Sequence, residues 1–265
     1  MAWLEQLGKD NRGSRPRCVL LMDGEKDEVA SRLTRLVGLP GEVSVAPSDT
    51  WMPHGKPVRK NDGSWDKKPT AEARLDRPNS LVDPKIQKEL QAWWLAVVRG
   101  AANTPNWDIA STCLIRGEGG LLLIEAKAHP SELSQAGKSL PSSKNSQSNH
   151  DQIGRAIAEA NKAFQAVTGK KWGLSRDSHY QLSNRFAWSW KLALLGIPVV
   201  LVYLGFLNAQ DMAREGRLFQ SEANWEHTLK DYCDGVVDDT CWGQWLDFRG
   251  VPLIPLIRGI DQPLQ

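Results

Sequence analysis

The chain has 265 residues, of which 41% are hydrophobic and 24% are charged, and these values exclude a disordered, collagen-like or coiled-coil protein. The 33 basic and 31 acidic residues leave a net charge of only +2, which argues against attraction to nucleic acid by overall charge alone. The charge is uneven, however: 84–204 holds 14 basic and 8 acidic residues, whereas 205–265 holds 5 and 10. Twelve tryptophans outnumber the three tyrosines and five phenylalanines.

The cysteines and the apolar stretches set expectations about compartment and partners. The four cysteines form no CxxC pair and have no histidine at zinc-finger spacing, so we expect free thiols and no zinc site. The N-terminus lacks a basic region followed by an apolar run, and the longest apolar stretch, 192–206, is too short to cross a bilayer. We therefore expect a cytoplasmic protein with no membrane partner.

The first third of the chain has few regular signals. Residues 17–22 (RCVLLM) suggest a short strand, and the apolar rhythm of 27–37 predicts a helix. Residues 41–84 are rich in proline and glycine, which is typical of a long irregular insertion. Trp51 and Trp65 lie among basic residues of this insertion, so they are candidates for substrate contact.

A helix and a hairpin follow. Proline in the first turn and an apolar stripe predict a helix over 84–98, ended by a glycine at position 100. Residues 107–115 and 121–129 read as two strands joined by a glycine-rich turn at 116–119. The serine-rich segment 134–149 is predicted to be a mobile loop, either a plain connection or a cover for a substrate.

The remaining elements alternate between helices and strands. The apolar periodicity predicts helices over 151–167 and 180–195, and a third over 224–233. The continuous apolar run 198–206 predicts a strand buried on both faces, and 251–257 predicts a last strand. This alternation indicates an α/β protein.

The hairpin carries ionisable side chains that a purely structural strand would not need. Because side chains alternate along a strand, Glu125 and Lys127 share the face of Leu121 and Leu123. With a turn at 116–119, residue 108 lies opposite residue 127. We therefore expect Asp108, Glu125 and Lys127 on one face.

Two converging carboxylates and a backbone carbonyl form a hard oxygen site of the kind that Mg²⁺ or Mn²⁺ prefers. A lysine beside such a site can orient a water molecule or stabilise charge on a phosphate. The alternative is that the Glu-x-Lys pair is a solvated strand end and the aspartate a turn residue.

Asp108, sixteen intervening residues and then Glu125-Ala126-Lys127 on a strand resemble the PD-(D/E)XK, or restriction-endonuclease-like, nuclease superfamily. The resemblance implies an α/β, restriction-endonuclease-like core over 84–206, in which helices flank a central mixed sheet. It leaves an N-terminal extension with the irregular insertion over 1–83, and a C-terminal segment over 207–265 that packs on the core.

The resemblance also implies roles for individual residues. Asp108, Glu125 and Lys127 would be catalytic, with Asp108, Glu125 and the carbonyl of Ala126 as metal ligands, and Glu89 from the preceding helix as a further metal carboxylate. Two features depart from the family pattern. Asn106-Trp107 stands where many members have proline, and the strand that usually precedes the aspartate must be very short or come from the N-terminal region.

The resemblance also implies a glutamine on the following helix, and Gln152 matches it by position. Other polar residues are candidates for substrate contact, each with a structural alternative: Arg155 is a backbone contact or part of a solvated helix face, Gln181 and Arg185 (with Asn184) form a polar patch at helical spacing or a helix edge, and His129, two residues after the motif, is a contact or a strand-end residue.

These observations predict metal-dependent phosphodiester hydrolysis of DNA with Mg²⁺ or Mn²⁺ as cofactor. One alternative is a catalytically inactive protein of the same fold that binds DNA or a partner in a DNA-processing assembly. Another is an unrelated hydrolase that uses Asp108 and Glu125 as a carboxylate pair without Lys127.

Overall fold

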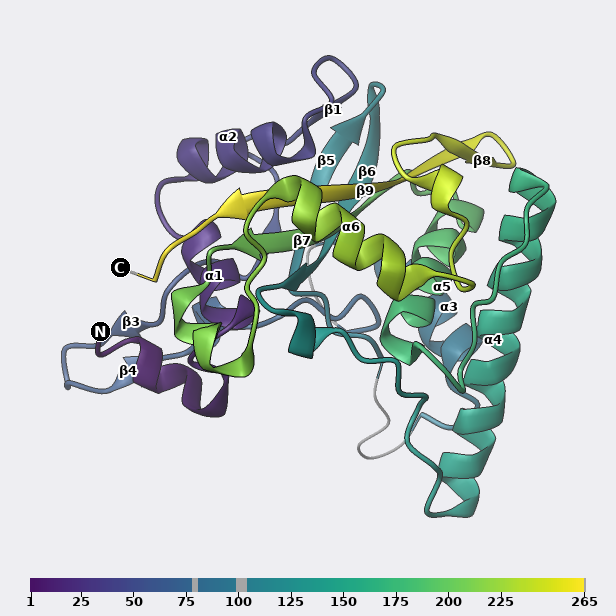
Figure 1. Cartoon of the computed structure of the whole chain (residues 1–265), viewed down its shortest axis with the longest axis horizontal. Helices are drawn as coiled ribbons and strands as arrows, with labels where there is room; N and C mark the ends of the chain where they lie inside the picture. The colour runs from purple at the N-terminus through teal and green to yellow at the C-terminus, as the bar shows by residue number, and fades with distance from the viewer. Residues whose placement is uncertain (78–80, 99–103, 265) are drawn as a thin grey trace.

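The computed structural model describes residues 1–77, 81–98 and 104–264, and a mixed, curled sheet runs through its centre (Figure 1). The strand order is β1-β5-β6-β7-β9-β8, and β2 also pairs with β5. Neighbours β6, β7 and β9 are parallel, whereas β1, β2 and β6 run antiparallel to β5, and β8 runs antiparallel to β9. The strands are β1 (Val43–Ser44), β2 (Trp51–Met52), β5 (Ile109–Ile115), β6 (Glu118–Lys127), β7 (Val199–Leu207), β8 (Leu246–Phe248) and β9 (Val251–Asp261).

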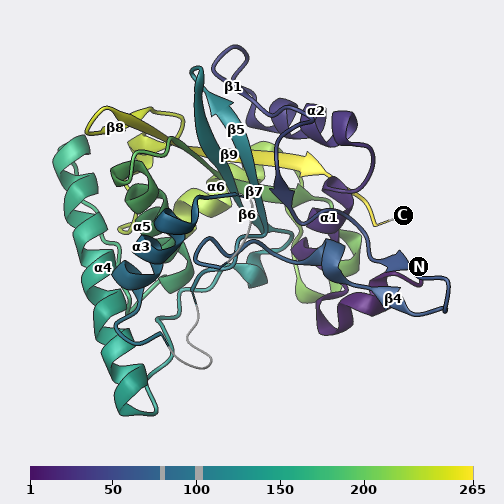
Figure 2. The ribbon, with the colours of Figure 1, turned by 180° about the vertical axis from the view of Figure 1, so that it is seen from behind.

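Helices cover both faces of this sheet, as Figures 1 and 2 show from opposite sides. One face packs against α1 and α2, and the other against the remaining α-helices. The helices are α1 (Ser14–Leu21), α2 (Lys26–Val37), α3 (Pro84–Trp94), α4 (Lys144–Thr168), α5 (Tyr180–Leu194) and α6 (Glu222–Cys233). The expected α/β architecture with a mixed sheet between helices is confirmed at this level.

Alternate residues of the buried strands divide between two apolar cores. On β7, Leu201 and Tyr203 pack with the helices of the α3–α6 side, whereas Val200 and Val202 pack with α1 and α2. The prediction that 198–206 forms a strand buried on both faces is therefore confirmed. Ten of the twelve tryptophans lie in these cores or pack against them, so most of them serve packing. Trp65 is half-buried and belongs to neither core, and its contact with substrate stays a prediction. Trp51 is only 6% exposed in the α2-side core, which overturns its predicted contact with substrate.

The sheet is completed by strands from both ends of the chain. The N-terminal segment supplies β1 and β2, which pair with β5, and the C-terminal segment supplies β9 beside β7. The N-terminal region thus provides the strands that lie beside the Asp108-bearing strand. In the chain between β2 and β5, β3 (Val58–Arg59) and β4 (Trp65–Asp66) form a separate small hairpin.

The turn between β5 and β6 is shorter than expected. It contains only Arg116 and Gly117, which have φ values of 52° and 87°, as two-residue hairpin turns require. The pairing is therefore shifted by two residues, and continuing it places Asp108 opposite Glu125 instead of Lys127. A shift of two preserves the face of every side chain, so the same-face prediction holds.

Residues 17–22 were expected to be a strand, and this prediction is wrong, because they belong to α1 and the turn that follows it. A short apolar run cannot distinguish a strand from a buried helix by periodicity. Here Arg17 is 2% exposed and bonds the Gly13 carbonyl and Asp211, so even its polar residue is buried.

The serine-rich segment is also more ordered than predicted. Ser143 caps α4 by accepting from the Ser146 N–H, and the Ser146 side chain accepts from the Ser143 N–H in return, so these serines start a helix. Helix α3 ends at Trp94, before the expected residue 98. The side chain of Asn149 accepts from the Val97 N–H (2.7 Å) and donates to the Val97 carbonyl (2.9 Å), which replaces helical bonds. The glycine predicted to end this helix lies outside the described residues.

All four cysteines are buried free thiols in the described structure. None of the helices in the described part of the chain is both long enough and apolar enough to span a membrane.

Candidate functional site

Three ionisable residues meet where β5 begins and β6 ends. Asp108 immediately precedes β5, and Glu125 and Lys127 lie in the last three residues of β6. The Lys127 ammonium forms a hydrogen-bonded ion pair with Glu125, and the Ala126 N–H donates to Asp108 Oδ2 at 2.8 Å. The hairpin therefore brings two carboxylates and one ammonium group to the same edge of the sheet.

Glu125 is held between two cations. Its Oε1 accepts from Lys127, and its Oε2 accepts from Arg185 Nε on α5 at 2.6 Å. The Glu125 side chain is 1% exposed, and burial by itself would raise its pKa. Arg185 and Lys127 outweigh that penalty and lower the pKa of Glu125, so this carboxylate is ionised at neutral pH.

Lys127 has two fixed partners. Its Nζ donates to Glu125 and to Gln181 Oε1, the latter at 3.0 Å. Burial favours the neutral amine, but the charges of Glu125 and Asp108 prevail and raise the pKa of Lys127. The ammonium is therefore charged and held in one position.

Asp108 has a different environment. It is half-buried, and burial, followed by the charge of Glu125, raises its pKa to about 7. Among the described residues, its Oδ1 has no hydrogen-bond partner, whereas Oδ2 is occupied by the Ala126 N–H. Asp108 therefore presents a free oxygen at a position where a second negative charge is unfavourable.

Two carboxylates at one edge of the sheet are the kind of donor that a hard divalent cation would need, but both oxygens of Glu125 already accept hydrogen bonds from Lys127 and Arg185. Within the described ranges no group of three or more His, Cys, Asp or Glu side chains is arranged to hold a metal. Mg²⁺, however, commonly binds proteins through one or two carboxylates and keeps several waters. Burial and then the charge of Glu125 raise the pKa of Asp108, and a cation between the two carboxylates would offset the second of these effects.

Arg185 connects this site to the rest of the fold. Besides Glu125, its guanidinium donates to the side chain of Asn184 at 2.7 Å and to the carbonyl of Asn106 at 2.6 Å. Its Cζ lies 4.8 Å from the centroid of the Trp107 ring. Arg185 was predicted to contact substrate, but its side chain is only 6% exposed. It fixes the Glu125 carboxylate relative to the segment that enters β5.

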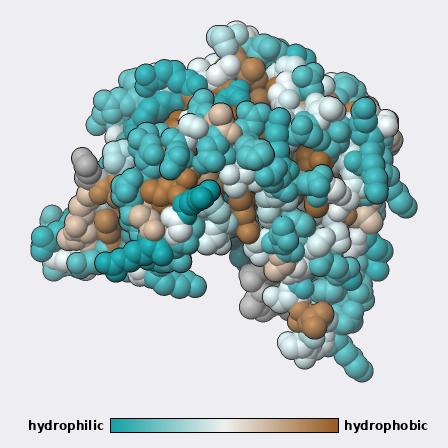
Figure 3. Space-filling model, in the orientation of Figure 1, coloured by the Kyte–Doolittle hydropathy of each residue, from teal (hydrophilic) through white to brown (hydrophobic). Residues whose placement is uncertain are grey.

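A pocket of about 560 Å³ opens beside these residues. The polar patch predicted on α5 forms part of its wall, as does Asp108. The described lining comprises Glu72, Arg74, Thr104, Pro105, Asn106, Asp108, Lys138, Tyr180, Gln181, Asn184 and Arg185. The carboxyl end of β6 points toward the concave lower edge of the molecule, which lies between the N-terminal segment and the first half of α4 (Figures 1 and 3).

The other predicted contacts lie outside the described lining of this pocket. Gln152 donates to the Trp93 carbonyl at 2.7 Å and accepts from Arg155, so it joins α4 to α3. Arg155 lines a different hollow, along α4. His129 is 3% exposed and bonds Ser131 at the start of a short 3₁₀ turn. Glu89, the predicted further metal carboxylate, is half-buried on α3 and is likewise outside the described lining of this pocket.

Two charged residues of the pocket, Glu72 and Arg74, were not predicted from the sequence. Glu72 and Arg74 follow the irregular insertion, and residue Ala73 between them pairs with Trp107 as an isolated bridge. Glu72 also accepts from Asn106 and forms an ion pair with Arg15 at 3.1 Å. No local pattern in residues 70–75 signals this bridge, because it depends on contact with a segment more than thirty residues away.

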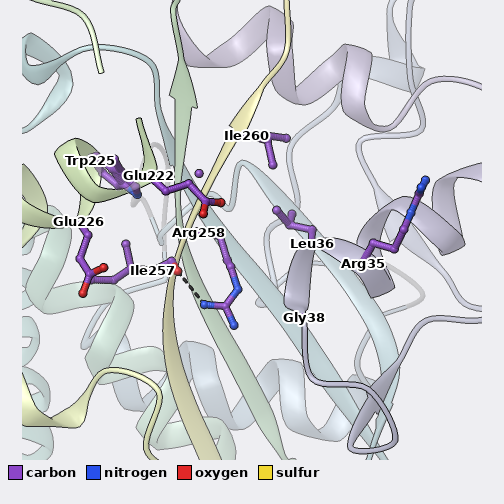
Figure 4. Close-up of a pocket in the computed structure, with 10 residues that line it drawn as sticks. Arg35, Leu36, Gly38, Glu222, Trp225, Glu226, Ile257, Arg258 and Ile260 are labelled. Carbon is purple, nitrogen blue, oxygen red and sulfur yellow. Dashed lines mark hydrogen bonds between the residues drawn. The ribbon is translucent and has the colours of Figure 1, made fainter. Parts of the chain in front are cut away.

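A second hollow, of about 410 Å³, lies between α2, α6 and β9 (Figure 4). Arg258 reaches across it and donates twice to the Val37 carbonyl, at 3.1 and 2.8 Å, and once to its neighbour Ile257. Arg258 therefore caps the C-terminal end of α2, where helix carbonyls lack partners and a positive charge is favourable. Glu222 and Glu226 of α6 line the opposite wall. The contacts of Arg258 in this hollow hold the end of α2 against β9 of the sheet.

The chain matches no protein-family profile, no curated protein and no solved structure. The fold and the site together define an α/β protein with a polar pocket at the edge of a mixed sheet, in which a buried Glu–Lys–Arg cluster adjoins a half-buried aspartate.

Proposed function

We propose that this chain is a metal-dependent nuclease with a PD-(D/E)XK-type site on a restriction-endonuclease-like core, and that it hydrolyses phosphodiester bonds of DNA. The observation that carries the proposal is the convergence of Asp108, Glu125 and Lys127 at the carboxyl end of β6, with hydrogen bonds linking Lys127 to Glu125 and Ala126 to Asp108. Each of the three has the chemistry that this reaction requires.

Asp108 and Glu125, with the carbonyl of Ala126, would hold Mg²⁺ or Mn²⁺. When bound, such an ion polarises the phosphoryl oxygen and lowers the pKa of the attacking water. Lys127 keeps a charged ammonium beside the site, where it would orient that water and stabilise the negative charge that develops on the phosphate. Gln181 and Arg185 would act through Lys127 and Glu125 by holding them in place.

DNA as the substrate is supported by the polar character of the pocket and by the basic residues near it. Arg74 and Lys138 line the same pocket as Asp108, and the segment 84–204 that carries the motif has six more basic than acidic residues. These groups can contact a phosphate backbone, whose binding energy is largely electrostatic.

A catalytically inactive DNA-binding or assembly protein of the same fold is the second candidate. The observation that favours it is the double pairing of Glu125, because Lys127 and Arg185 already neutralise this carboxylate in the absence of a metal. Such a protein would bind DNA in a salt-dependent manner without cleaving it.

The experiment is a nicking assay on supercoiled and linear DNA with Mg²⁺, Mn²⁺ or EDTA. We expect metal-dependent cleavage by the wild type, loss of cleavage in Asp108→Ala and in Lys127→Ala, and full activity in the control Asp261→Asn at the exposed end of β9. Circular dichroism checks that the variants fold. Cleavage that persists unchanged in both site variants would refute the assignment, and DNA binding without cleavage by the wild type would favour the second candidate.

A further inference from the structure

Lys138 contributes a positive charge to the pocket that the protein itself does not neutralise. Its side chain is half-buried, and its Nζ lies 5.0 Å from the centroid of the Tyr180 ring. In the described parts of the chain no carboxylate forms an ion pair with it. Burial lowers the pKa of Lys138, and no neighbouring charge offsets this effect, so an anion in the pocket would be a favourable partner.

The backbone around Lys138 is held in place by the segment that leads into α5. The Lys138 N–H donates to the Arg176 carbonyl at 2.8 Å, and the Tyr180 N–H donates to the Ala136 carbonyl at 3.0 Å. Ala136 and Ser178 also form an antiparallel bridge. The backbone of the segment that carries the lysine is therefore fixed before any ligand arrives, which reduces the entropy that this segment loses on binding.

The residue before the lysine is required by this close approach. A Cβ atom on Gly137 would lie 2.5 Å from the Asp177 carbonyl oxygen and 2.7 Å from its carbon, and both atoms belong to the backbone. Any larger residue would push the segment away from its partner. Gly137 thus allows Lys138 to reach the pocket wall that also contains Asp108 and Asn184.

We propose that Lys138 is a phosphate-binding residue, and that it contacts a nonbridging oxygen of the DNA phosphate next to the one at the Asp108–Glu125 site. This inference rests on the proposed function. In the described structure Glu125 is neutralised by Lys127 and Arg185, whereas Asp108 forms no ion pair. An ionised Asp108 would repel a phosphate, and the Lys138 ammonium supplies compensating positive charge in the same pocket. The long, flexible lysine side chain suits a backbone contact, which carries no sequence preference.

The test measures binding of a short fluorescent DNA duplex in EDTA, where hydrolysis does not occur, as a function of salt concentration. Loss of one phosphate contact lowers the slope of log affinity against log salt by about 0.9. We expect Lys138→Gln to show this reduction and about 3- to 10-fold weaker binding at low salt, and Lys138→Arg to restore both. The matched control Lys170→Gln removes the same charge from an exposed position after α4 and should leave the slope unchanged.

A second variant tests the position of the lysine instead of its charge. Gly137→Ala keeps Lys138 but displaces the segment, so it should reproduce the loss of slope, whereas Gly119→Ala, whose Cβ meets no atom within 4 Å, should not. A wild-type slope in Lys138→Gln, an equal loss in Lys170→Gln, or no binding of the duplex by the wild type would each overturn the inference.

The nicking assay separates this inference from the proposed function. Wild-type cleavage combined with an unaltered salt slope in Lys138→Gln would remove the phosphate contact and leave the nuclease assignment standing. A reduced salt slope in Lys138→Gln, combined with a wild type that does not cleave DNA with any metal, would support the phosphate contact and remove the nuclease assignment.

Discussion

Replacing Asp108 by asparagine should stabilise the protein at neutral and alkaline pH. In the folded chain the pKa of this carboxyl is about 7, against an ordinary value of 3.8, because it is buried beside Glu125. Between these two pH values the folded state keeps a proton that the unfolded state has lost, so the stability that Asp108 contributes falls as pH rises from about 4 to about 7. The asparagine side chain of the variant has no charge to desolvate and can still accept from the Ala126 N–H.

The magnitude follows from the difference between the two pKa values. A difference of roughly 3 pH units corresponds to an upper limit of about 4 kcal/mol. Because Asp108 is half-buried and water screens part of the repulsion, we expect a measured gain of about 1–3 kcal/mol in the free energy of unfolding at pH 8, and almost none at pH 4.

The assay is urea unfolding in EDTA at several pH values, followed by tryptophan fluorescence and checked by far-ultraviolet circular dichroism. A gain of the same size at pH 4 and pH 8, or a variant that is less stable than the wild type at pH 8, would refute the reasoning. Addition of Mg²⁺ should stabilise the wild type above pH 7 and leave Asp108→Asn unchanged, because the variant lacks the charged ligand. Cleavage by the wild type should increase as pH rises through about 7, because Asp108 loses its proton there.

Further predictions concern the buried ion pair, the packing of α6 and the metal. Arg185→Met should destabilise the fold by about 3–5 kcal/mol in urea unfolding, because Glu125 would keep only one of its two buried cationic partners. Gly205→Ala should cost about 1–3 kcal/mol, since its Cβ would lie 2.5 Å from the Trp225 ring, whereas the control Gly119→Ala should change stability by less than about 0.5 kcal/mol. Removing divalent cations with EDTA should abolish DNA cleavage, and Mg²⁺ or Mn²⁺ should restore it; cleavage that survives EDTA would contradict the proposed use of a metal.

Most of the regular elements could be predicted from local sequence. The helix predicted over 27–37 and the strand predicted over 198–206 differ from α2 and β7 by one residue at their boundaries. Both carry a strong signal, a 3.6-residue apolar period in the first and a continuous apolar run in the second. The element at 17–22 was wrong because a short, wholly buried run has no period to identify it.

The candidate site divides in the same way between local and distant information. The face shared by Asp108, Glu125 and Lys127 follows from the two-residue alternation of a strand, which no even shift of register can change. The partners that set their charge states do not follow from it. Arg185 reaches Glu125 from 60 residues away, and its approach depends on how α5 packs on the sheet.

The sequence by itself determined which segments form the hairpin and which ionisable groups stand at its end, because strand alternation and turn chemistry act between near neighbours. Only the tertiary structure decided that Glu125 is paired twice, that Asp108 titrates near neutral pH, and that Lys138 reaches the same pocket. These properties arise from burial and from electrostatic interactions between distant segments. The net charge of +2 is a sum over the whole chain and does not describe the pocket. The fold decides which charged residues meet there.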